Sequence, residues 1–343
     1  MSGSKLIPGP KTMPTRRLAI LAAAVAVAGC RRNARKTIAV IPKSAADQFF
    51  LTVHAGAEEA ATQFNLDMTW NGPDRETEYS RQIQIVDMMI SRHVDAIAIS
   101  AADDRALVAP LERARRAGIP VTIFDSAVNL EDYVSLIATD NQGAGVTAAN
   151  LIAGLLPRGG KIAMLMQRPG GTSTELRERG FAETITRDFP NLNIVARMYG
   201  LGDSAKSMAE AENILTANPD LVGFFASSEA ASVGAIRALR ARGLAGKVKL
   251  VTLDVSEIHV AALRDGTVDV MLVQDAFKIG YEAVKSLSDK LTGKTPQRRL
   301  DIPAKAVYKA DLDKPEIQAL LHPRFTQKNS PPHHCFPLCP DIS

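Results

Sequence analysis

The feature that most constrains this fold is the regular alternation of short apolar segments with longer amphipathic segments between residues 36 and 312. The apolar segments, such as Thr-Ile-Ala-Val-Ile at 37–41, have the length and composition of buried parallel strands. The longer segments, such as 76–91, repeat their apolar residues at helical spacing. Strands that alternate with helices in this way predict an α/β protein with parallel sheets.

The alternation passes through two cycles of similar order. Strands are predicted at 37–41, 66–70, 96–100, 120–124 and 134–138 in the first cycle, and at 161–166, 194–199, 221–226, 248–253 and 268–274 in the second. Two consecutive sets of this kind predict two similar domains that face each other across a cleft. Ligand pockets often form at such interfaces.

The loop after the first strand carries side chains that suit a sugar. Residues 42–48 include Lys43 and Asp47 and are followed by Phe49 and Phe50. In open α/β sheets, ligands bind at the carboxyl ends of the strands. Aromatic rings can stack on the C–H faces of a sugar, and charged groups can bind its hydroxyls. The alternative is that the two rings only fasten the start of the following helix to the core.

Other predicted strands also end in polar residues. Three of them end at Asp125, Asp254 and Gln274. Ser228 closely follows a fourth strand, and Arg177 lies in the helix after a glycine-rich loop. Carboxylates and amides bind hydroxyl groups, and an arginine can donate to two neighbouring oxygens. Capping of the next helix could explain any one Asp or Ser, but several such groups beside aromatic rings favour a polar ligand.

The N-terminus has the pattern of a bacterial export signal. Two arginines precede the apolar stretch 18–28, which is short for a membrane span but suits a signal peptide. The stretch leads into Val-Ala-Gly-Cys, which ends at Cys30 and resembles a lipobox. We therefore expect residues 1–30 to be a lipoprotein signal peptide, with Met1 or Met13 as the start and lipidated Cys30 as a membrane anchor. The alternative is an ordinary secretory signal that ends in a chance cysteine.

Composition argues against several classes of function. The 41 basic and 37 acidic residues give a net charge of +4, and four of the positive charges lie within the predicted signal peptide. A nearly neutral mature chain lacks the basic stripe that nucleic-acid binding needs. The three cysteines, Cys30, Cys335 and Cys339, leave the predicted folded body without disulfides, so its stability must come from its core.

The sequence gives no sign of an enzyme or a metal site. The loop after the first strand lacks the glycine fingerprint of a dinucleotide-binding oxidoreductase, and no Ser/His/Asp arrangement is apparent. His333, His334, Cys335 and Cys339 match no structural metal site. The prolines of this region predict a disordered tail over residues 314–343. We therefore expect no catalysis, no cofactor and no metal.

Seven segments, taken together in their order and spacing, resemble bacterial periplasmic sugar-binding proteins of the type I, ribose-binding class. They are IAVIPKSAADQFF, GIPVTIFDSAV, IATDNQGAG, GGTSTELRERGF, PDLVGFFASSEAASVGAIRAL, VKLVTLDVS and VDVMLVQDAFKIGYEAV. The resemblance covers residues 36–312 and implies two flavodoxin-like lobes joined by three crossovers. The implied first lobe is 36–138 plus 275–303, and the implied second lobe is 139–274 plus 304–313.

The resemblance also implies a function. Such proteins of the cell envelope capture a sugar in the cleft and deliver it to an ABC-type permease. For this chain we expect a lipid-anchored, monomeric solute-binding protein for a monosaccharide or related polyol. The alternative is a sugar or autoinducer sensor that presents its closed form to a receptor kinase. A transcriptional repressor with the same core would need a helix-turn-helix before Lys36, where the signal peptide stands instead.

The resemblance assigns roles to individual residues. The implied hinge residue is Asp140, and the implied ligand-binding residues are Lys43, Asp47, Phe49, Phe50, Asp125, Arg177, Ser228, Asp254 and Gln274. A solvated loop position is the alternative for Lys43. Ser126 stands where ribose binders have an arginine, and Gly202 stands where a second-lobe aromatic is expected, with Tyr199 as a candidate replacement. These departures point to a ligand other than ribose.

Overall fold

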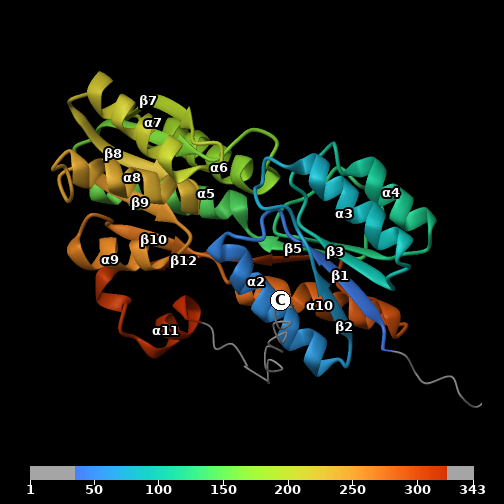
Figure 1. Ribbon diagram of the computed structural model, residues 1–343. Coiled ribbons are helices and arrows are strands. Elements are labelled where there is room, and N and C mark those ends of the chain that lie inside the picture. The colour runs from blue at the N-terminus through green and yellow to red at the C-terminus, as the bar shows by residue number, and fades with distance from the viewer. Residues whose placement is uncertain (1–34, 323–343) are drawn as a thin grey trace, which may run out of the picture. The chain divides into compact units, whose positions relative to one another are not determined.

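Two six-stranded sheets organise the chain in a computed structural model that describes residues 35–322 (Figure 1). We call each sheet with its covering helices a lobe. The predicted signal peptide, the lipidation site Cys30 and the alternative start at Met13 lie outside the described residues, as do residues 323–343. None of the helices within residues 35–322 has both the length and the apolar character that a membrane span requires.

The first lobe contains the sheet of order β11-β5-β4-β3-β1-β2, in which all neighbouring strands pair in parallel. Its strands are β1 (Thr37–Ile41), β2 (Asp67–Trp70), β3 (Ala96–Ile99), β4 (Val121–Phe124), β5 (Leu136–Thr139) and β11 (Arg299–Ile302). Its helices are α2 (Gln48–Gln63), α3 (Tyr79–Ser91), α4 (Val108–Arg116) and α10 (Ala276–Leu291). Successive residues of β1 point to opposite faces, so Val40 packs with α2 and α10, and Ile41 packs with α3 and α4.

The second lobe contains the sheet of order β12-β10-β9-β8-β6-β7, in which β12 alone runs antiparallel to its neighbour. Its strands are β6 (Gly160–Met166), β7 (Leu192–Tyr199), β8 (Leu221–Ala226), β9 (Lys249–Leu253), β10 (Val270–Val273) and β12 (Lys305–Val307). Its helices are α5 (Asn141–Leu155), α6 (Thr172–Asp188), α7 (Ser204–Ala217), α8 (Glu229–Ala241) and α9 (Glu257–Asp265). Helices α5 and α6 pack in one apolar cluster, and α7, α8 and α9 pack in another.

The chain passes between the two sheets three times: after β5, after β10 and between β11 and β12. This topology confirms the predicted α/β class with two lobes built on mainly parallel sheets. The limits of the lobes, 36–138 plus 275–303 and 139–274 plus 304–313, stay a prediction.

Helix α2 begins at Gln48, so Phe49 and Phe50 belong to its first turn. Apolar patterning does not predict strands β11 and β12, because each is short and partly exposed.

The prediction of disorder from residue 314 is wrong at its start. Pro315 begins the short helix α11 (Pro315–Leu321), which follows a 3₁₀ turn at Lys309–Asp311. Proline is tolerated in the first turn of a helix, because its missing N–H would have no partner there. Ile317 is buried in the core of the second lobe and holds the helix in place.

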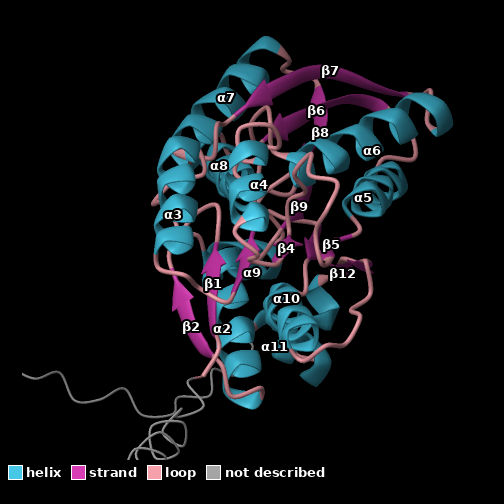
Figure 2. Cartoon of the chain, turned by 90° about the vertical axis from the view of Figure 1, so that its right-hand side faces the viewer, coloured by secondary structure: helices cyan, strands magenta, loops and turns pink. Residues whose placement is uncertain are grey.

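Helices α2 and α10 lie side by side in the first lobe (Figures 1 and 2). Glycines stand where their backbones approach. Gly56 of α2 faces the carbonyl group of Phe277, and Gly280 of α10 faces the carbonyl group of Val53. A Cβ atom at either glycine would overlap the facing carbonyl oxygen, so this contact depends on two residues without side chains.

We expect Gly280→Ala to destabilise the protein by about 1–3 kcal/mol, because the added methyl group must push the two helices apart. Gly154→Ala is the matched control, since position 154 near the end of α5 has open space around it. That variant should be neutral or more stable by about 0.5–1 kcal/mol. Urea unfolding of both variants measures the difference, and equal stabilities would contradict this account of the helix contact.

Candidate functional site

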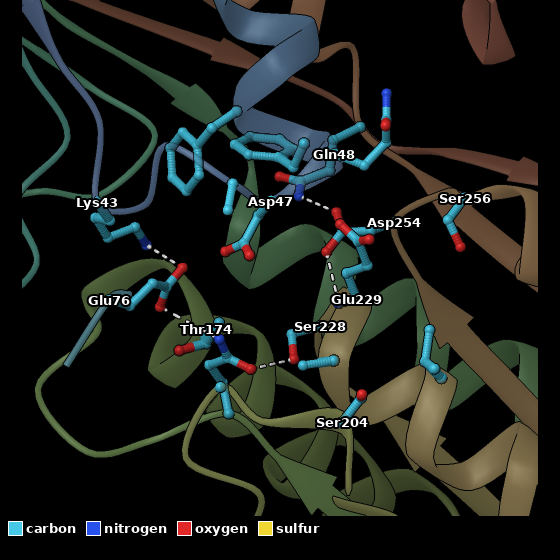
Figure 3. A pocket seen from close by; sticks show the side chains of 18 of the residues that line it. Lys43, Asp47, Gln48, Glu76, Thr174, Ser204, Ser228, Glu229, Asp254 and Ser256 are labelled. Carbon is cyan, nitrogen blue, oxygen red and sulfur yellow. Dashed lines mark hydrogen bonds and ion pairs between the residues drawn. The ribbon is translucent and has the colours of Figure 1, made fainter. Parts of the chain in front are cut away.

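A cavity of about 570 Å³ lies between the two lobes, at the carboxyl ends of the strands (Figure 3). The first lobe contributes the loop after β1, the start of α2 and the end of β4. The second lobe contributes α6, α8 and the ends of β9 and β10. The structure brings all nine residues of the predicted site to this one cavity: Lys43, Asp47, Phe49, Phe50, Asp125, Arg177, Ser228, Asp254 and Gln274. Their role in binding stays a prediction.

The guanidinium of Arg177 is buried and held by three groups from different elements. Its Nε donates to Asn141 Oδ1 (2.7 Å) at the start of α5, and its Nη2 donates to Gln274 Oε1 (2.7 Å) after β10. Its Nη1 donates to the carbonyl oxygen of Ser227 (3.0 Å) after β8. An arginine has five N–H donors in a fixed plane, so these bonds leave two of them unused.

Gln274 connects the crossover after β5 to the acidic end of β9. Its Oε1 also accepts a hydrogen bond from Thr139 Oγ1 (2.6 Å), and its Nε2 donates to Asp254 Oδ1 (2.5 Å). The other carboxylate oxygen of Asp254 accepts from the backbone N–H of Glu229 (3.0 Å). Burial raises the pKa of Asp254, and the nearby charge of Arg177 and the hydrogen bond from Gln274 offset only part of this effect.

Lys43 is buried between two carboxylates of the first lobe. Its Nζ lies 3.0 Å from Asp125 Oδ2 and 3.9 Å from Glu76 Oε1. It also donates to Ser173 Oγ (3.3 Å) in α6 of the second lobe. Asp125 is held in turn by a hydrogen bond from Ser100 Oγ (2.7 Å). The solvated alternative for Lys43 is therefore wrong, because the side chain is only 3% exposed.

The two aromatic rings belong both to the core and to the cavity wall. Phe49 and Phe50 contact each other edge to face, with ring centroids 5.0 Å apart. Phe50 is buried in the core of the first lobe, Phe49 packs against the same core, and both line the cavity. The two interpretations of these rings are therefore compatible, because fastening α2 to the core also fixes the rings beside the polar groups.

Two carboxylates from opposite lobes line the cavity near each other (Figure 3). Asp47 precedes α2, but its side chain does not cap that helix. Glu229 is the first residue of α8, and its Oε2 atom is inaccessible to solvent and has no hydrogen-bond partner within residues 35–322. Burial and the charge of Glu76 raise the pKa of Asp47 to about 6. Burial and the charges of Asp254 and Asp47 raise the pKa of Glu229 to about 8.

The sequence pattern does not single out several residues that line the cavity. Gln167 donates from Nε2 to Glu76 Oε2 (3.2 Å) across the two lobes, and its Oε1 accepts from Ser228 Oγ (2.5 Å). Ser228 also caps α8 by accepting from the backbone N–H of Ala231 (3.4 Å), as its alternative interpretation expects. Glu229 could have been found from its place directly after the polar end of β8. Glu76 lies in a turn before α3 and gives no such signal.

Three further residues are Tyr199, Gly202 and Asp140, and none of them is shown to contact a ligand. Tyr199 lines a separate hollow with Arg197 and not this cavity, so its choice as a replacement ring is wrong. Gly202 lines the cavity and supplies no ring there. Asp140 lies at the first crossover and caps α5 by accepting from the backbone N–H of Gly143 (2.9 Å). Its role as a hinge stays a prediction.

The cavity offers the chemistry of binding. In the part of the chain that the structure describes, no group of three or more His, Cys, Asp or Glu residues could hold a metal ion. The buried His259 lies outside the cavity lining, where it is hydrogen-bonded to Ser256 Oγ (2.8 Å), and burial lowers its pKa to about 4. Donors, acceptors and two aromatic rings converge on one hollow, which suits a small ligand that carries hydroxyl groups.

We expect the free energy of unfolding to fall as the pH rises from 6.5 to 9. Burial raises the pKa of Glu178 to about 7 and that of Glu229 to about 8, above the ordinary value of 4.5. Both groups bind protons more tightly in the native state, so the stability that they contribute is complete below about pH 4.5 and is lost as the pH passes their native pKa values. His259 stays neutral over this range.

Replacing Glu229 with Gln removes one of these titrating groups and should reduce the loss of stability. Urea unfolding of the native protein and of Glu229→Gln at pH 6.5 and pH 9 measures the effect. Two results would contradict the raised pKa values of Glu178 and Glu229. One is a native protein that becomes more stable as the pH rises, and the other is a Glu229→Gln variant that loses as much stability between pH 6.5 and pH 9 as the native protein does.

Comparisons with known proteins agree in one family. The family model of the periplasmic binding protein domain matches residues 38–295. A D-ribose/D-allose-binding protein of Pseudomonas aeruginosa is 32% identical over 274 residues, which are 77% of this chain and 85% of the relative. A ribose import binding protein of Bacillus subtilis is 27% identical over 269 residues, which are 78% of this chain and 86% of the relative.

Solved structures resemble the chain over most of its length. A carbohydrate transporter solute binding protein of Agrobacterium radiobacter, in complex with D-arabinose, superposes with a TM-score of 0.81 and is 29% identical, covering 84% of this chain and 99% of the other. An ABC transporter solute binding protein of Agrobacterium vitis with bound D-fucose gives a TM-score of 0.80 and 31% identity, covering 83% and 99% of the two chains. The likeness therefore extends across both lobes.

Proposed function

This chain belongs to the periplasmic binding protein family, and from that premise we propose that it is a solute-binding lipoprotein of a sugar importer. It captures a monosaccharide or related polyol between its lobes and delivers it to an ABC-type permease. The observation that carries this proposal is the convergence of hydrogen-bonding groups from both lobes on one cavity beside two aromatic rings. Relatives named for ribose or allose, and structures with bound D-arabinose or D-fucose, support a ligand of this size.

The ligand contacts follow from the geometry of the cavity. Carboxylate and amide oxygens of Asp125, Asp254 and Gln274 accept hydrogen bonds from sugar hydroxyls, and Arg177 donates to neighbouring oxygens. The rings of Phe49 and its neighbour stack on apolar C–H faces. A sugar that lacks one hydroxyl leaves a buried protein group unpaired, which is the physical basis of selectivity.

Binding also stabilises closure of the two lobes. Asp125 belongs to the first lobe, whereas Arg177 and Asp254 belong to the second, so a ligand that contacts all three favours the closed arrangement by its differential contacts. The three crossovers act as the hinge, and Asp140 fixes the start of α5 directly after the first of them. The protein acts as a monomer, and the permease recognises the surface that closure creates.

We expect the protein to show a concentration-dependent rise in melting temperature with at least one monosaccharide, in a screen of pentoses, hexoses, deoxy sugars and polyols. Asp254→Asn should weaken binding of that sugar at least tenfold, because it removes a charged acceptor in the cavity. Asp220→Asn is the matched control, since Asp220 is exposed, lies outside the cavity and pairs with Lys161. The affinity of this variant should equal that of the native protein. A screen in which no sugar shifts the melting curve would contradict the proposed function.

The lipid anchor has its own test. We expect the full chain, expressed in a bacterium, to be recovered in the membrane fraction, and Cys30→Ser to be recovered in the soluble fraction. A lipidated cysteine holds the protein at the membrane surface, and serine cannot be lipidated in this way. A native protein that is soluble, or a variant that stays with the membranes, would contradict the lipoprotein assignment.

A further inference from the structure

The charges that line the cavity do not balance. Its wall contains two basic residues, Lys43 and Arg177, and six acidic residues: Asp47, Glu76, Asp125, Glu229, Asp254 and Glu257. Bringing carboxylates into a partly desolvated space is costly unless each has a cationic or hydrogen-bonding partner. The carboxylates that lack a cationic or hydrogen-bonding partner in the protein are therefore those whose charge a ligand would have to offset.

The two basic residues account for three of the carboxylates. Lys43 lies against Asp125 and Glu76, and Glu76 also lies 3.5 Å from Arg168 Nε. The charge of Arg177 stabilises ionised Asp254, and both side chains bind Gln274. Of the remaining three, Asp47 and Glu257 are exposed, whereas Glu229 is only partly exposed.

The carboxylates of Asp47 and Glu229 face the cavity from opposite lobes. A hydrogen bond with Ser44 and the charge of Lys43 offset only part of the rise that burial causes in the pKa of Asp47. No ion pair joins either carboxylate to a basic side chain among residues 35–322. The backbone N–H of Phe49 reaches the Glu229 carboxylate, but Glu229 Oε2 has neither a hydrogen-bond partner nor solvent contact. The two groups come from opposite lobes, and each negative charge disfavours ionisation of its neighbours in the cavity. Figure 3 shows both side chains directed into the cavity.

We propose that the ligand is a cationic sugar derivative, an amino sugar or an amino polyol, whose ammonium group binds between Asp47 and Glu229. This inference rests on the proposed function and specifies its ligand class. An ammonium group has three donors and one positive charge, so it can pair with the two facing carboxylates and favour the ionised form of Glu229. The hydroxyls of the same ligand bind the groups around Asp125, Arg177 and Asp254.

The arrangement favours an organic cation over a metal ion. In the described part of the chain, no cluster of three or more acidic, histidine or cysteine side chains could coordinate a metal. The rings of Phe49 and Phe50 stand beside the two carboxylates and suit the C–H faces of a carbon skeleton. A neutral sugar would instead accept a hydrogen bond from protonated Glu229, the form that its raised pKa favours at pH 7 in the free protein, and this is the competing outcome of the test.

Isothermal titration calorimetry at pH 7 compares neutral and cationic ligands of the same shape. The probes are D-glucose, D-galactose and D-mannose, their 2-amino-2-deoxy derivatives, and the N-acetyl forms, which remove the charge. We expect at least one amino sugar to bind ten times or more tightly than its neutral parent and its N-acetyl form. Glu229→Gln and Asp47→Asn keep the size of each side chain and remove its charge. Each should reduce that preference to less than threefold.

Glu316→Gln is the matched control, because Glu316 is exposed on α11 outside the cavity and the substitution is chemically the same. It should leave the preference for the amino sugar unchanged. If each neutral sugar binds as tightly as its amino derivative, this inference is wrong, but the proposed function is still supported. A preference that survives in both cavity variants would overturn it as well. A protein that binds no sugar of either kind would refute the proposed function and this inference together.

Discussion

The buried guanidinium of Arg177 is the interaction on which the arrangement of the cleft depends. A positive charge withdrawn from water is tolerated only when its donors are paired, and loss of one partner of a buried charge typically costs about 3–5 kcal/mol. Arg177 obtains its partners from the start of α5, the end of β8 and the end of β10. Three separate strand ends and helix starts are therefore fixed relative to one side chain of α6. Because two of these elements adjoin crossovers between the lobes, the same network links the wall of the cavity to the places where the lobes are joined.

The parallel sheets explain why so many polar groups meet. Each β-α unit delivers a strand end to the same edge of its sheet, and two acidic residues stand there with left-handed backbones, Asp125 (φ +56°) and Asp254 (φ +72°). Such a conformation costs on the order of 1–3 kcal/mol outside glycine and persists where surrounding contacts hold it. Here the contacts are Ser100 and Lys43 on one side and Gln274 and the α8 backbone on the other. The strain and the hydrogen bonds together fix where each carboxylate points.

Much of this architecture could be predicted because it follows from local pattern. Alternating apolar strands and amphipathic helices predict the sheets, and polar residues at strand ends predict the members of one cavity. The burial of Lys43 could not be predicted, since it depends on Asp125 and on Ser173 of the other lobe. Glu76 joins the cavity through an equally distant contact with Gln167. Tyr199 lines a different hollow although Gly202, three residues later, lines the cavity, and the sequence carries no signal that separates the two positions.

The most direct test of the account measures whether a ligand draws the two lobes together. In a chain whose three native cysteines are replaced with serine, nitroxide labels at Arg116→Cys in α4 and Asn213→Cys in α7 report one distance between the lobes by pulsed electron paramagnetic resonance. A saturating ligand should shorten the mean distance between the labels and narrow the distribution of distances, because one ligand contacts groups of both lobes. An unchanged distribution, with binding verified in the same sample, would contradict a site shared between them.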